Sequence, residues 1–202
     1  MSDATAVRRV PGPELLGHVE GVRQVYAEAF GATPWSQDEG AAGRFAARLA
    51  ADVIRPGFVA ALALDGGVVL GFATAWTTPA AFPADHCYPQ VTASLGAERT
   101  AAWLCGAREV DELAVLGAAR GRSVGAALLD TVTADAPGGR CWLLTSVRAE
   151  LLRFSRRGRW VDGQSCGDEA GPELDPAQLA AELAVGVVGG GESGVGHCSA
   201  HE

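Results

Sequence analysis

Residues 109–129 read EVDELAVL, then GAA, then RGRSVGAALL. The first part predicts a strand over 109–116, and the run of small residues after the turn predicts a helix over 121–135. A strand, a tight turn and a helix N-terminus in this order leave several backbone N–H groups without partners beside the positive end of the helix dipole. The stretch therefore predicts an anion site, most naturally for a pyrophosphate.

The side chains of this turn support the same interpretation. Arg120 and Arg122 would add positive charge, and Gly125 and Ala126 would let a ligand approach the backbone. A Walker A loop is excluded because the chain contains no lysine, and the spacing is not Gly-x-Gly-x-x-Gly. The alternative is a strand–turn–helix corner whose small residues only allow close packing.

The predicted elements on either side of this stretch define the fold class. Apolar residues at helical spacing predict helices over 13–30 and 36–53, the second opened by a capping box of Ser36 and Glu39. Strands over 58–64 and 68–76 flank Asp65-Gly66-Gly67, which predicts an antiparallel hairpin. The remaining predicted elements are a helix over 89–104, a strand over 141–147 and a helix over 149–157. This order indicates an α/β (α+β) fold with a mixed central sheet flanked by helices.

Charge divides the chain near residue 162. The formal net charge is −8 over 202 residues, but all 16 arginines and 17 of the 24 acidic residues lie in 1–162. Residues 163–202 hold seven acidic residues and no arginine. We expect a nearly neutral folded domain over 1–162 and an acidic, glycine-rich tail over 163–202, poorly ordered apart from one short helix between Asp175 and Gly189. A net acidic chain is also a poor candidate for binding nucleic acid.

The sequence favours a cytoplasmic protein. We find no secretory signal and no apolar run that suits a membrane span. The five cysteines form no Cys-x-x-Cys pair, which is typical of reduced, mostly inert thiols. His197-Cys198 and His201 are too few, and too close to the terminus, to predict a metal site.

The segment Arg120–Gly125 resembles the phosphate-binding motif of the GNAT superfamily of N-acetyltransferases, Arg/Gln-x-x-Gly-x-Gly/Ala. The preceding Glu-Leu-Ala-Val strand, the two leading helices, the hairpin and the helix before Gly158 and Trp160 also resemble that family, so the resemblance covers about residues 10–162. It implies a mixed, mostly antiparallel central sheet that splays at the Glu-Leu-Ala-Val strand and ends in a final strand pair. Beyond Asp162 no β alternation is evident, so a complete C-terminal pair is left open.

The resemblance implies transfer of an acetyl (acyl) group from acetyl-CoA directly to a primary amine. The backbone of Leu113, Ala114 and Val115 would hold the pantetheine arm, and an N–H near Val115 would stabilise the oxyanion. The residues implied for the phosphates are Arg120, Gly121, Arg122, Ser123, Val124, Gly125 and Ala126. The implied partners are acetyl-CoA and an amine that the sequence does not identify, and a homodimer is left open.

Deprotonating the amine requires a base, for which Glu112 is the best candidate, with Asp111 and then Glu109 behind it. Strict strand alternation places Glu109, Asp111, Leu113 and Val115 on one face and Glu112 and Ala114 on the other. The sequence does not decide which face meets the cleft. Any one of the three acids could also simply be solvated at a strand end.

Two departures from the family pattern favour an alternative function, a non-catalytic acyl-CoA-binding or regulatory module with a degenerate site. Ser123 stands where glycine is usual, so we expect weaker cofactor binding. Phe154 stands where the family often has the tyrosine that protonates the departing thiolate, so we expect slower turnover.

Overall fold

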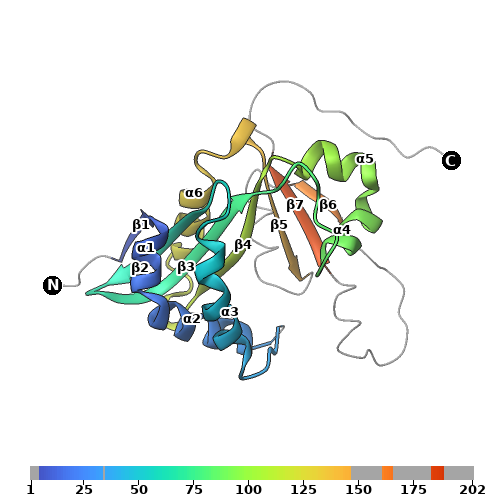
Figure 1. Cartoon of the computed structure of the whole chain (residues 1–202). Coiled ribbons are helices and arrows are strands. Elements are labelled where there is room, and N and C mark those ends of the chain that lie inside the picture. The colour runs from blue at the N-terminus through green and yellow to red at the C-terminus, as the bar shows by residue number, and fades with distance from the viewer. Residues whose placement is uncertain (1–4, 34, 147–160, 166–182, 189–202) are drawn as a thin grey trace.

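The structure, a computed structural model, describes residues 5–33, 35–146, 161–165 and 183–188 (Figure 1). Its centre is a seven-stranded sheet in the order β1-β2-β3-β4-β5-β7-β6. The strands are β1 (Ala6–Val10), β2 (Val59–Asp65), β3 (Val68–Thr77), β4 (Arg108–Val115), β5 (Cys141–Ser146), β6 (Val161–Ser165) and β7 (Leu183–Val188). The pair β4–β5 is parallel and every other neighbouring pair is antiparallel. The predicted mixed, mostly antiparallel sheet is therefore confirmed.

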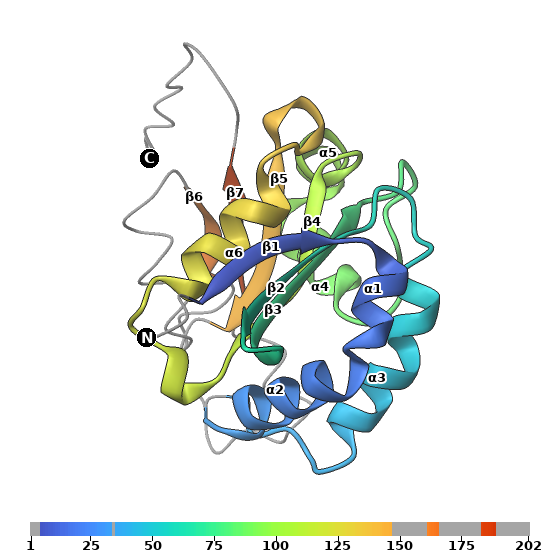
Figure 2. The same ribbon diagram turned by 90° about the vertical axis from the view of Figure 1, so that its left-hand side faces the viewer.

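Helices cover both faces of this sheet. They are α1 (Gly12–Gly17), α2 (Val19–Gly31), α3 (Ala41–Asp52), α4 (Tyr88–Leu95), α5 (Ala97–Arg99) and α6 (Val124–Thr133). Helices α1 to α3 lie on one face of the sheet and α6 lies on the other (Figure 2). We call the face covered by α1 to α3 the α3 face and the opposite face the α6 face.

The sequence of β2 and β3 explains the two layers. Successive strand residues point to opposite faces, so Leu62 and Phe72 pack with Phe45 and Leu49 on the α3 face. The intervening positions in β2 and β3 include Ala61, Ala63, Ala73 and Ala75, which pack with α6. Small side chains on the α6 face let Leu128 and its neighbours approach the sheet closely.

The N-terminal half differs from the sequence prediction in three places. The edge strand β1 was not expected, because it is short and exposes Arg8 and Arg9 in place of an apolar alternation. The predicted helix over 13–30 is divided into α1 and α2 at His18. The Ser36 capping box is wrong: α3 begins at Ala41, and it is Asp38 that accepts a hydrogen bond from the Gly40 N–H at 2.8 Å.

Two strands near the C-terminus complete the sheet. β7 pairs with β5, and β6 pairs with β7 on the outer edge. The segment Leu183–Val188, which was expected within a short helix, forms a strand because it has a strand partner on each side. Its sequence LAVGVV is a continuous apolar run without alternation, as is typical of strands inside a sheet. The predicted helix over 149–157, with Phe154, lies outside the described residues.

Candidate active site

β4 and β5 separate part-way along their length. Their parallel register joins only Arg108–Val110 to Cys141–Leu143, whereas β4 continues to Val115 and β5 to Ser146. Figure 1 shows the two strands diverging. The other edge of β4 remains paired with β3 as far as Val115. Among the described residues, no strand pairs with the edge of residues 113–115 on the β5 side, and we call it the free edge of β4. An extended ligand could hydrogen-bond to its backbone groups as an added strand would.

A β-bulge interrupts β4 next to this separation. Thr74 of β3 is opposite Glu112, but the next residue, Ala75, is opposite Val110, so Asp111 is an extra residue in β4. A bulge of this kind changes which face the following side chains occupy. It explains how two acidic residues that are adjacent in sequence can act on the same side of the sheet.

The bulge overturns the alternation predicted for the acidic residues. The opposite pairs Phe72–Ala114, Thr74–Glu112 and Trp76–Glu109 all lie on the α3 face, because directly opposed residues share a face. The Asp111 carboxylate reaches the same face, where it accepts a hydrogen bond from Thr74. Glu109 and Asp111 therefore share a face with Glu112 and Ala114. The prediction that they share a face with Leu113 and Val115 is wrong.

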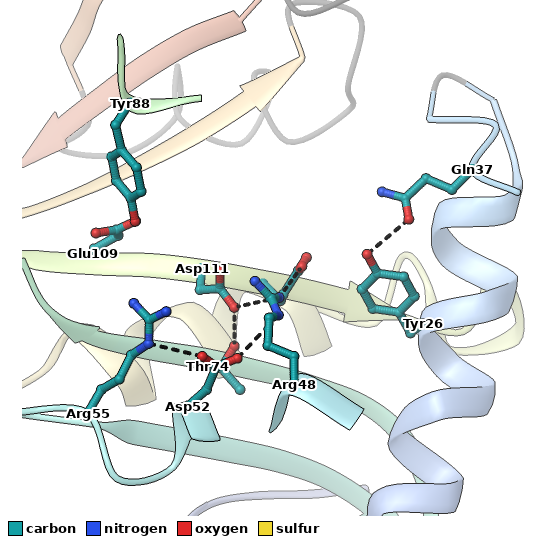
Figure 3. Close-up of polar contacts among 10 residues, drawn as sticks. Tyr26, Gln37, Arg48, Asp52, Arg55, Thr74, Tyr88, Glu109 and Asp111 are labelled. Atoms are coloured by element: carbon teal, nitrogen blue, oxygen red, sulfur yellow. Dashed lines mark hydrogen bonds and ion pairs between the residues drawn. The ribbon is translucent and has the colours of Figure 1, made fainter. Parts of the chain in front are cut away.

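Four carboxylates gather on this face, and we call Asp52, Glu109, Asp111 and Glu112 the carboxylate cluster. Arg48 of α3 joins two of them: its Nη2 lies 3.3 Å from Asp111 Oδ2 and 3.2 Å from Glu112 Oε1 (Figure 3). Thr74 Oγ1 donates to Asp111 Oδ2 at 3.4 Å. The two candidate bases are thus held by one shared guanidinium.

Asp52 ties the cluster to the end of α3. Its side chain is 2% exposed, and its two oxygens lie 3.2 Å from Arg48 Nε and 2.9 Å from Arg55 Nε. The Arg55 guanidinium also lies over the Trp76 ring, 4.1 Å from its centroid. The sequence prediction missed Arg48, Asp52 and Arg55. Their spacings of four and three residues place them near one another on α3 and the turn that follows, but nothing local identifies β4 as their partner.

Glu109 has a separate set of partners at the closed end of the β4–β5 separation. It accepts a hydrogen bond from Tyr88 Oη at 2.7 Å and one from Thr78 Oγ1 at 3.3 Å. Trp142 Nε1 in turn donates to Thr78 Oγ1 at 2.8 Å. Glu109 is thus bound by neutral hydroxyl groups, whereas Asp111 and Glu112 are bound by a cation.

Burial changes the protonation of all three β4 acids. It raises the pKa of Asp111 to about 7, although Arg48 opposes the shift. Burial and the neighbouring Asp111 charge raise the pKa of Glu112 well above its usual value, and burial also raises the pKa of Glu109. Asp111 and Glu112 both contact the same Arg48 nitrogen, so the negative charge of one carboxylate disfavours a charge on the other. A base that titrates near neutral pH is suited to accept a proton from an amine.

The residues of the predicted anion site follow the other end of β4, and we call residues 120–126 the anion loop. Gly121 has φ +75° and Ser123 has φ +60°, and α6 begins at Val124. The first backbone hydrogen bond onto Ser123 comes from Ala127, so the N–H groups of Val124–Ala126 at the start of α6 have no partner within the helix. Arg120 and Arg122 are exposed beside these groups, with Arg120 Nε 3.4 Å from the Val115 carbonyl. The loop can therefore hold an anion.

Leu113, Ala114 and Val115, the residues expected to bind an extended ligand, lie on β4 beyond the bulge and shortly before the anion loop in sequence.

No described helix has the length and apolar character that crossing a bilayer requires. In the described ranges, no three His, Cys, Asp or Glu side chains are arranged to hold a metal ion. Phe154, His197, Cys198 and His201 lie outside the described residues.

Comparison with known proteins identifies the fold. No protein-family model and no curated protein sequence matches the chain. Among solved structures, a protein described as a GNAT-family acetyltransferase from Desulfovibrio desulfuricans is 18% identical with a TM-score of 0.58, covering 92% of this chain and 99% of its own. A structure from Corynebacterium glutamicum, described as histone acetyltransferase HPA2 and related acetyltransferase, is 15% identical with a TM-score of 0.58, covering 96% and 100%.

A third similar structure contains a ligand. The PaiA N-acetyltransferase from Thermoplasma acidophilum, solved in complex with coenzyme A, is 10% identical with a TM-score of 0.53 and covers 93% of this chain and 99% of its own. These likenesses show that the chain has the GNAT fold. The resemblance seen in the sequence is confirmed at that level.

Proposed function

We propose, on the premise of the GNAT fold, that this protein transfers an acetyl (acyl) group from acetyl-CoA directly to a primary amine. The observation that carries the proposal is the arrangement along β4. Its free edge at residues 113–115 leads into the anion loop, and its bulge presents Asp111 and Glu112. β4 thus offers a free backbone edge and a base, and the loop that follows it offers an anion site. We also propose a cytoplasmic location, in keeping with the cysteine usage.

The cofactor-binding part of the proposal rests on backbone groups. In it, residues 113–115 bind the pantetheine arm through their free edge and residues 120–126 bind the pyrophosphate. The exposed Arg120 and Arg122 and the N–H groups of Val124–Ala126 have the charge and the donors that phosphate oxygens need. A similar fold in complex with coenzyme A supports the choice of anion.

In the proposed reaction Glu112, paired with Asp111, accepts a proton from the bound ammonium group and frees its lone pair. The amine nitrogen then forms a bond to the thioester carbonyl carbon, and an N–H near Val115 stabilises the oxyanion. Collapse of the tetrahedral intermediate breaks the carbon–sulfur bond. The thiolate leaves and takes up the second proton lost by the nitrogen, giving an amide and free CoA. A free thiol has a pKa of about 8.5, so the thiolate can leave without a dedicated acid.

The alternative is a non-catalytic acyl-CoA-binding module, and the left-handed backbone of Ser123 in the anion loop favours it. The two functions differ in one assay: thiol release from acetyl-CoA with a panel of amines, run beside a thermal-shift titration with CoA. Thiol release together with a shift supports the transferase. A shift without release from any amine supports the binding module, and neither signal contradicts both.

A further inference from the structure

Arg48 contacts three of the four carboxylates of the carboxylate cluster. Its Nη2 contacts both Asp111 and Glu112, and its Nε contacts Asp52. The guanidinium also lies 5.5 Å from the centroid of the Phe45 ring. Arg48 therefore joins the end of α3 to both members of the candidate base pair through a single rigid group.

Arg48 is also the one cation in contact with that pair among the described residues. The other guanidinium of the region, Arg55, makes its ion pair with Asp52. Two carboxylates that contact the same guanidinium nitrogen repel each other when both are charged. The positive charge of Arg48 between them favours the state in which the pair carries one negative charge over the state in which both carboxylates are protonated. Without Arg48, the pair would hold its protons to a higher pH.

The other groups around the pair do not replace that charge. Tyr26 of α2 faces it and donates to Gln37 at 2.9 Å, and burial raises the pKa of Tyr26 to about 12. Asp52, Glu109, Cys87 and Tyr88 complete the titratable surroundings, together with Arg55. Apart from Arg55, none of these groups carries a positive charge, so none of them compensates a negative charge on the pair.

We propose that Arg48, held by Asp52, is a positioning residue that keeps one negative charge on the Asp111–Glu112 pair at the pH of the reaction. The inference rests on the proposed function, because it specifies how the proposed base is kept ready to accept a proton. Arg48 acts through the carboxylates and does not itself need to touch the acceptor.

The alternative is that Arg48 only stabilises the fold. This structural role can be separated from control of the charge on the Asp111–Glu112 pair, because a substitution of Arg48 should leave the fold intact. The Arg48 side chain is 41% exposed, so a shorter side chain there leaves space open to solvent and no buried cavity. Phe45 and Leu49, which are 3% and 1% exposed, still anchor α3 to the sheet. We therefore expect Arg48→Gln to fold.

The test compares the pH profile of kcat/KM for the wild type, Arg48→Gln, Arg48→Lys and Arg44→Gln. Arg44 is the matched control, because it lies one turn earlier on α3 and pairs with the exposed Asp38 at 2.6 Å. We expect the acid limb of Arg48→Gln to move up by about one pH unit or more, which lowers kcat/KM at least about fivefold at pH 7 and restores it at higher pH. Arg48→Lys should keep the wild-type limb, and Arg44→Gln should leave the whole profile unchanged.

A uniform loss in Arg48→Gln, with the acid limb at the wild-type pH, would overturn the inference and leave the transferase intact. Absence of thiol release from the wild type would instead contradict the proposed function. In that case the melting temperature of wild type and Arg48→Gln between pH 5 and 9 still decides the inference. The inference is supported if the melting temperature of the variant continues to fall to a higher pH than that of the wild type. It is refuted if the two proteins show the same dependence of melting temperature on pH.

Discussion

The anion loop follows β4 and three residues of the carboxylate cluster lie on β4, but the two regions act by different physics. The loop is exposed and offers backbone N–H groups, whose partial charges are fixed and do not change with pH. The cluster is largely buried and acts through side chains whose charge depends on pH. Changes in the loop should therefore alter how tightly CoA binds. Changes in the cluster should alter turnover and its dependence on pH.

The sharpest test of this separation is Glu112→Gln. Losing the base should lower kcat/KM for the amine by about 10²-fold or more, while the CoA thermal shift should stay unchanged, because the anion loop is built from other residues. Glu98→Gln, an exposed acid on α5, is the control for losing one negative charge. If Glu112→Gln weakened CoA binding as much as turnover, the two regions would not be separable.

The converse experiment removes both arginines of the anion loop. Arg120→Ala combined with Arg122→Ala should raise KM for acetyl-CoA about 10- to 100-fold, which is about 1.4–2.7 kcal/mol in total. Two exposed contacts should together give less than the full range of about 1.5–3 kcal/mol for each hydrogen bond to a charged group, because water screens them. We expect kcat to change less than threefold and the salt dependence of KM to weaken, as steady-state kinetics at two ionic strengths would reveal. Arg99→Ala on α5 is the matched control. A fall in kcat with unchanged KM would contradict the assignment of this loop to the cofactor.

The cluster should also leave a signature in folding stability. Burial raises the pKa of Asp111 to about 7, against roughly 3.9 in an unfolded chain. The folded state therefore binds more protons between these values, and its free energy of unfolding should fall as pH rises through that window, by at most about 1.4 kcal/mol per pH unit. Urea unfolding at pH 5, 6, 7 and 8 measures this slope. Asp111→Asn should flatten it, and an equally steep slope in that variant would show that other groups cause it.

The same contrast explains how much the sequence could predict. The anion loop is contiguous, and its turn, its small residues and the start of its helix are all local features, so residues 120–126 could be identified directly. Helices, hairpin and mixed sheet followed from periodicity in the same way. The edge strand β1 was missed and the strand pair β6–β7 was left open, because these strands form by pairing with distant strands and show no local alternation.

The cluster could be predicted only in part. Glu112, Asp111 and Glu109 were named as candidates, but strict alternation separated Glu112 from the other two. A single extra residue in β4 reunites them, and that bulge depends on the register against β3. Arg48 and Asp52 come from α3, about 60 residues earlier in the chain, and no local pattern links them to β4. Side chains assembled across elements require the tertiary structure.

The smallest predicted effect is that of replacing Ser123. The experiment distinguishes a cost of its backbone conformation to folding from a cost to ligand binding. Ser123 has φ +60° and Ser36 has φ +43°, so both hold a left-handed conformation that glycine adopts more easily. We expect Ser123→Gly and Ser36→Gly each to raise the free energy of unfolding by up to about 1 kcal/mol, measured by urea titration. Only Ser123 lies in the anion loop, so only Ser123→Gly should also tighten CoA binding, by a few-fold. Equal CoA affinity in the two variants would mean that the serine costs folding stability but does not hinder the phosphates.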